Sequence, residues 1–213
     1  KLMKKLSVAV LLISLVVGCT PKIYRSMGMQ PTLTVSTYRS NLMPVFDSIV
    51  QPLYFTADVT FKENTLSGML ALSKEGERSY RIVMMTTFGM QIFDFSLSAD
   101  SFIVHSCMDK LNKKVILNIL RNDFRSILML DVPDQFKGVL YQTSANSQRW
   151  GCSLKTKNGE YNYLVYPAKN GFVRMVGRGS GIKGMIGVFD EELITIDHSK
   201  LGLKINLKLI KQE

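Results

Sequence analysis

The residues of this chain that could do chemistry are few and lie far apart in the sequence. Its two histidines are His105 and His198. Cys107 follows His105 by two residues, and on a strand that spacing places both side chains on one face, where they could begin a metal site. No other His or Cys stands at a metal-ligand spacing from either histidine. We therefore interpret the pair as part of a half-buried strand and predict neither a metal nor a cofactor.

Three further patterns suggest catalysis or anion binding, and each lacks a necessary part. Asp197-His198-Ser199 contains the residue types of a catalytic triad, but neighbouring strand residues point to opposite faces. The glycine-rich residues 177–184 lack the Lys-Ser/Thr ending of a phosphate loop, and a tight hairpin is the better interpretation. Glu191-Glu192 could be a carboxylate pair, but consecutive carboxylates at a turn are usually only solvated. We predict that the protein is not an enzyme.

The N-terminal residues are typical of a bacterial lipoprotein signal. Three lysines within the first five residues precede an apolar run at residues 6–17. Twelve helical residues rise only about 18 Å, which is too short to span a bilayer, so the run indicates an export signal. Gly18-Cys19 closes it and resembles a lipobox, in which cleavage precedes the cysteine and the cysteine is lipidated. This predicts a signal peptide at residues 1–18 and a membrane anchor at Cys19.

The anchor also predicts where the protein resides. Thr20, rather than Asp, follows Cys19, which by the sorting rule of enteric-type lipoproteins favours the outer membrane, and we expect the periplasmic face. The formal charge is +10, and residues 145–185 are especially basic. Because export argues against nucleic acid as a partner, a basic face would meet anionic lipid headgroups or lipopolysaccharide, or would simply be solvated. Cys107 and Cys152 would remain as thiols that either pair or stay free.

From residue 54 onward, short apolar runs alternate with turn residues, which is the pattern of antiparallel strands. The short connections leave no room for the helices that parallel strands would need. Asn158-Gly159 and Asn170-Gly171 are strong hairpin turns. The predicted strands are residues 54–61, 66–72, 79–87, 90–97, 102–107, 138–143, 148–155, 161–166, 172–178, 182–188, 193–197 and 203–210.

Residues 109–130 interrupt the strands with apolar residues at helical spacing. Ser106 and Asp109 resemble a capping box before them, and Asn122-Asp123 could divide the segment into two helices, with Asp123 capping the second. Residues 19–36 have no clear period and are interpreted as a tether after the lipidated cysteine. A short helical or irregular segment is expected at residues 37–50. Residues 37–213 are predicted to form one domain.

The fold class that follows is mainly β (α+β): an antiparallel incomplete β-barrel of about 11–12 strands with a central helical block as a lid. The segment Leu66-Ser67-Gly68-Met69-Leu70, with Tyr80-Arg81-Ile82-Val83 and Thr87-Phe88-Gly89-Met90 after it, is similar to the first sheet of LolA/LolB-like envelope lipoproteins. The resemblance implies a cavity between barrel and helices that holds acyl chains. Residues of two strand faces would line such a cavity: Phe93, Phe95, Leu97, Phe172 and Val176.

Two functions therefore stand as hypotheses. The first is a lipoprotein, anchored in the outer membrane through Cys19, that binds or chaperones a lipid or acyl chain in a half-barrel. The second is a non-enzymatic structural or assembly lipoprotein that docks a protein partner of the envelope through the curved sheet or the basic face.

Overall fold

The structure is a computed structural model, and it describes residues 22–38, 49–142, 150–156, 159–166, 172–178, 185–189, 193–198 and 202–210. Two helices and thirteen strands lie in these ranges. They are α2 (Lys22–Ser26), β1 (Gln30–Tyr38), β2 (Leu53–Phe61), β3 (Asn64–Gly76), β4 (Ser79–Thr86), β5 (Gln91–Ser98), β6 (Phe102–Cys107), α4 (Lys114–Ile127), β7 (Gln135–Gln142), β8 (Trp150–Thr156), β9 (Gly159–Tyr166), β10 (Phe172–Arg178), β11 (Met185–Phe189), β12 (Leu193–His198) and β13 (Leu203–Leu209).

The strands form one hydrogen-bonded order, β1-β7-β8-β9-β10-β11-β12-β13-β2-β3-β4-β5-β6. Every neighbouring pair is antiparallel. Two meanders, β2–β6 and β7–β13, are thus joined where β13 pairs with β2. The order ends at β1 and β6, so among the described strands the sheet does not close. The predicted class, mainly β with antiparallel strands and few helices, is confirmed.

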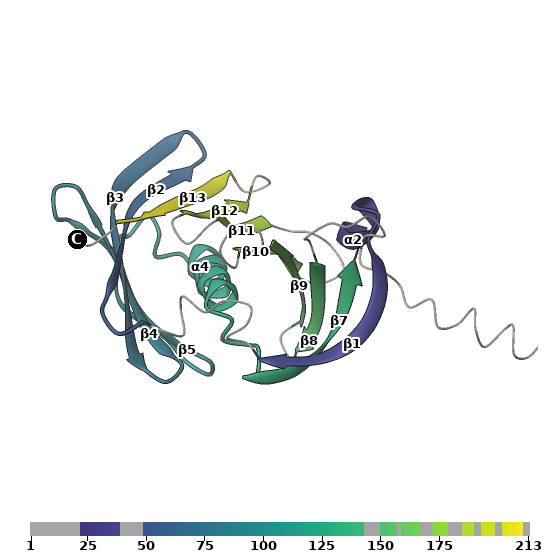
Figure 1. The fold of residues 1–213 in the computed structure, drawn as a ribbon. Coiled ribbons are helices and arrows are strands. Elements are labelled where there is room, and N and C mark those ends of the chain that lie inside the picture. The colour runs from purple at the N-terminus through teal and green to yellow at the C-terminus, as the bar shows by residue number, and fades with distance from the viewer. Residues whose placement is uncertain are drawn as a thin grey trace, which may run out of the picture.

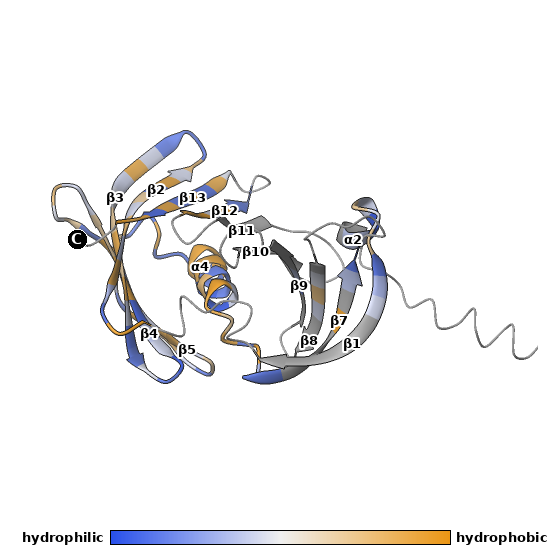
Figure 2. Ribbon diagram, in the orientation of Figure 1, coloured by the Kyte–Doolittle hydropathy of each residue, from blue (hydrophilic) through white to orange (hydrophobic). Residues whose placement is uncertain are grey.

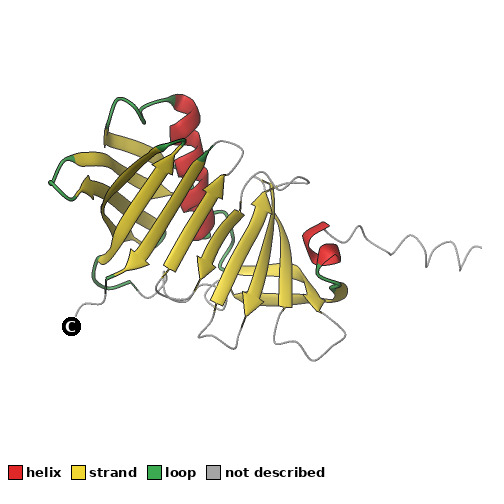
Figure 3. Cartoon of the chain, turned by 90° about the horizontal axis from the view of Figure 1, so that it is seen from above, coloured by secondary structure: helices red, strands yellow, loops and turns green. Residues whose placement is uncertain are grey.

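The sheet curves strongly, and helix α4 lies on its concave side (Figure 1). Seen from above, α4 crosses the strands of one half, whereas α2 stands at the other end of the molecule (Figure 3). Apolar residues cluster on α4 and on the strands around it (Figure 2). Strand β13 alternates as the sequence predicts: Leu203, Ile205 and Leu207 are buried, whereas Lys204 and Lys208 are exposed.

The predicted strands are confirmed with small shifts of their ends, and the strands at residues 102–107 and 172–178 have the predicted bounds. Gly159 begins β9, whereas Asn158, Asn170 and Gly171 lie outside the described residues. The strand that the sequence missed is β1. Residues 22–36 of the predicted tether form α2 and most of β1, and β1 pairs with β7 about a hundred residues later. Of the segment expected at residues 37–50, residues 39–48 are outside the description.

The helical block is one helix rather than two. Asn122 and Asp123 lie inside α4, so Asp123 does not cap a second helix. The predicted capping box is also wrong. The N-cap residue is Lys113, which makes no side-chain cap hydrogen bond, and Ser106 still belongs to β6. No helix in the described ranges is both long and apolar enough to cross a bilayer.

Candidate functional site beneath helix α4

Helix α4 faces the sheet with one apolar stripe. Ile116, Leu120, Phe124 and Ile127 recur at steps of three and four residues, which places them on one side of a helix, and all four are buried. The ring of Phe124 meets the ring of Phe93 on β5 edge-on, with 6.4 Å between centroids. The helix is therefore held to β5 chiefly by contact between apolar side chains.

The residues predicted to line a ligand cavity on β5 are those that α4 covers. Phe93, Phe95 and Leu97 are 2%, 0% and 1% exposed and belong to the main core. Phe93 stacks on Phe95 at 4.6 Å. All three pack as core side chains. Phe172 and Val176 lie in β10, a strand of which the structure describes the backbone but not the side chains.

A buried polar contact joins the middle of α4 to the sheet. Nε2 of His198, the last residue of β12, lies 2.8 Å from Oδ2 of Asp123. Their side chains are 13% and 5% exposed. Sequence reasoning missed this pair because 75 residues separate its members. One signal in the sequence could have indicated a buried polar partner. Asp123 follows Leu120 by three residues and therefore places a carboxylate on the apolar stripe of the helix. Ser199, the third member of the predicted triad motif, lies outside the described residues.

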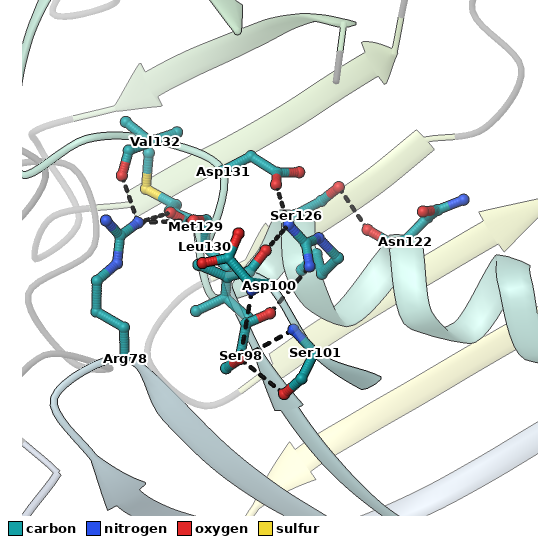
Figure 4. Close-up of polar contacts among 12 residues, drawn as sticks. Arg78, Ser98, Asp100, Ser101, Asn122, Ser126, Met129, Leu130, Asp131 and Val132 are labelled. Atoms are coloured by element: carbon teal, nitrogen blue, oxygen red, sulfur yellow. Dashed lines mark hydrogen bonds and ion pairs between the residues drawn. The ribbon is translucent and has the colours of Figure 1, made fainter. Parts of the chain in front are cut away.

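Two arginines anchor the C-terminal end of α4 and the buried turn after it (Figure 4). Arg125 Nη1 donates to Ser98 O at 2.9 Å, and its Nη2 donates to Ala99 O at 2.5 Å and forms an ion pair with Asp131. Arg78 Nη2 donates to Leu130 O at 2.7 Å and to Val132 O at 2.6 Å. We call these contacts the arginine clamp. It ties this end of α4 to the β3–β4 and β5–β6 turns.

His105 and Cys107 do not share a face, so the sequence interpretation was wrong on this point. Asp94 pairs with Ser106 and Phe95 pairs with Val104, which leaves His105 as an extra residue in β6. Such a β-bulge interrupts the alternation of faces. Cys107 packs against the core, whereas His105 is exposed and its Nε2 lies 2.8 Å from Ser96 Oγ. Within the described ranges, no cluster of three His, Cys, Asp or Glu residues could hold a metal.

Asp94 on β5 is a second buried carboxylate with a fixed partner. Arg81 Nε donates to its Oδ1 at 3.0 Å and Arg81 Nη2 to its Oδ2 at 2.9 Å, and Gln91 Nε2 adds a bond of 3.2 Å. The hydrogen bond from Arg81 lowers the pKa of Asp94, and this effect exceeds the opposing effect of burial. The contact fastens β4 to β5 on the side of the sheet away from α4.

Cys107 and Cys152 are both free thiols. Burial raises the pKa of each, and that of Cys152 reaches about 12. Other predicted features fall outside the description: Gly18 and Cys19, residues 179–184, Glu191-Glu192 and the basic side chains of residues 145–185.

The turn between β4 and β5 presents two exposed apolar side chains. Phe88 is 91% exposed and Met90 is 60% exposed. The turn is well braced: Thr86 N donates to Met90 O at 2.8 Å, and Met90 N donates to Thr86 Oγ1 at 3.1 Å. Gly89 between them has a φ of 79°, a conformation that favours glycine. We call Phe88 and Met90 the apolar tip.

No protein-family model, no curated protein and no solved structure matches this chain.

Proposed function

We propose that this chain is an outer-membrane lipoprotein of the periplasmic face, anchored through Cys19, that binds or chaperones a lipid or acyl chain in a LolA/LolB-like half-barrel. The ligand would lie between the concave face of the sheet and α4, with α4 as the lid. One observation carries the proposal: an amphipathic helix covers the apolar residues of β5 on the concave side of an open, curved sheet.

The chemistry beneath α4 suits an acyl chain. Phe93, Phe95 and Leu97 offer only apolar side chains to whatever covers them. A methylene chain can replace the apolar stripe of the helix there, because burial of apolar area is favourable by about 25 cal/mol per Å² whichever molecule supplies it. Binding would thus exchange one apolar cover for another over these three side chains.

The polar attachments of α4 suit a lid that stays joined at one end. The arginine clamp holds the C-terminal end through several backbone carbonyls. Along the body of the helix, the His198–Asp123 pair is a further polar contact to the sheet. We propose that α4 pivots about the clamp when this pair separates.

The first test is native mass spectrometry of the mature chain with Cys19→Ser, purified without detergent. We expect a stoichiometric amphiphile that added fatty acid displaces. A clean mass of the protein alone, together with no uptake of added fatty acid, would overturn the lipid-binding proposal.

The apolar tip favours a second candidate function, in which this non-enzymatic lipoprotein docks a protein partner of the envelope. An exposed Phe next to an exposed Met is the type of surface that anchors protein contacts. Phe88→Ser separates the two functions: it would reduce partner binding and leave the uptake of fatty acid unchanged.

A further inference from the structure

Helix α2, which begins three residues after the predicted lipidation site, packs firmly on the sheet. Tyr24 in α2 is 1% exposed, and its hydroxyl lies 2.8 Å from Cys152 O and 3.0 Å from Tyr163 O. Its ring stacks on Tyr141 with 4.2 Å between centroids. Met29, also 1% exposed, completes this small core. Helix α2 is thus fixed to β7, β8 and β9.

Gly151 on β8 makes room for the Tyr24 ring. A Cβ atom at position 151 would lie 2.3 Å from Tyr24 Cε1 and 2.8 Å from Tyr24 Cδ1. Both distances are far below van der Waals contact, so any other residue would push the ring out. Glycine at position 151 is therefore what allows the Tyr24 ring to pack against β8.

The outer side of this segment suits an anionic surface. Arg25 is exposed, and Met27 beside it is 37% exposed. Residues 20–29 contain Lys22 and Arg25 but no Asp or Glu. Basic residues close to a bilayer anchor are attracted to anionic headgroups.

Docking of Tyr24 leaves little free chain between the anchor and the body. Cys19 and Lys22 are three residues apart, which allows about 10 Å when fully extended. A free tether of sixteen residues would allow about 50 Å. Helix α2 and β1 lie at one side of the molecule, and β4 and β5 lie at the other (Figure 1).

We infer that residues 22–29 form a rigid foot that seats the β7–β8–β9 end of the sheet directly on an anionic phospholipid surface. Arg25 and Met27 meet the headgroups, and the β4–β5 side is held away from them. This inference rests on the proposed lipidation of Cys19.

The test uses the full lipidated chain in vesicles of phosphatidylethanolamine and phosphatidylglycerol. A photoactivatable diazirine amino acid replaces Met27 in one sample and Phe88 in another, and crosslinked phospholipid is quantified by mass spectrometry. We expect about tenfold more crosslinking from position 27 than from position 88, because contact decays within the headgroup layer.

Two variants test the role of Tyr24. Gly151→Ala and, independently, Tyr24→Ser should each lower crosslinking at position 27 severalfold while the protein still floats with the vesicles. Gly76→Ala is the matched control, because its Cβ would lie an ordinary 3.6 Å from the nearest atom, Ser79 Cβ.

The outcomes separate the foot from the anchor. A lipidated chain that floats but crosslinks equally at positions 27 and 88, or is unaffected by both variants, would overturn the foot alone. A chain without acyl mass at Cys19 that does not float would overturn the anchor, and the foot with it.

Discussion

At the scale of single residues, the fold is marked by charged groups that are buried with a partner. The Asp94 carboxylate accepts hydrogen bonds from Nε and Nη2 of Arg81. Asp123 contacts His198, and Asp131 contacts Arg125. Burial of a carboxylate is costly unless it is paired, so each contact fixes one specific placement of the elements that carry its two members. Two of the three concern α4 or the turn after it.

Asp94 predicts a definite acid sensitivity. Because its pKa is lowered in the folded state, its contribution to stability is present above the unfolded pKa of about 3.9 and is lost as the pH falls through the lower folded value. We expect Asp94→Asn to flatten the fall of the unfolding free energy below about pH 4, as measured by urea denaturation at a series of pH values.

The control for this prediction is Asp58→Asn, which also replaces a strand carboxylate by an amide, but at an exposed position. An Asp94→Asn protein with the same slope as wild type would contradict the assigned role of the Arg81 contact.

The polar residues show what the sequence could not predict. Alternation along one strand placed His105 and Cys107 on one face. The bulge at His105 is set by the register against β5, which alternation along one strand does not reveal. The His198–Asp123 pair likewise depends on where α4 lies on the sheet.

At the scale of elements, turn residues and alternation were sufficient for twelve strands, because these lie in hairpins between neighbours in the chain. Strand β1 was not predicted, because its partner β7 is distant in the sequence and because Pro31 stands near its start. Proline is tolerated at edge strands, and β1 is an edge strand. Helix α4 was predicted from its period, but its lack of a break at Asn122-Asp123 reflects its packing against the core.

The arginine clamp predicts a large effect of a single substitution. Arg125→Met would leave the Asp131 carboxylate and the carbonyls of Ser98 and Ala99 without this donor. We expect a loss of about 2–4 kcal/mol in the free energy of unfolding, since buried groups would lose a charged partner. Urea denaturation measures it.

Arg121→Met is the matched control, because Arg121 lies one turn earlier on α4 and is partly exposed. It should cost well below 1 kcal/mol, as substitutions away from buried networks do. Equal losses for the two variants would show that the clamp does not anchor α4.

At the scale of the whole molecule, the sheet separates three proposed tasks. We propose that the foot at β7–β9 faces the bilayer, whereas α4 lies on the concave side and the apolar tip lies on the β4–β5 side. The packed core beneath α4 means that an acyl chain can enter only if the helix moves. We therefore propose that the protein is in equilibrium between a state with α4 docked and a ligand-bound state in which α4 is displaced.

The most direct measurement of that equilibrium is a titration of the Cys19→Ser chain with a fluorescent fatty acid. It compares the wild type with His198→Gln and with the exposed control Lys204→Gln. We expect saturable binding that oleate displaces. We also expect severalfold tighter binding by His198→Gln, because a less populated docked state lowers the cost of displacing α4. Lys204→Gln should bind as the wild type does. Absence of saturable binding, or equal affinity of His198→Gln and the wild type, would contradict it.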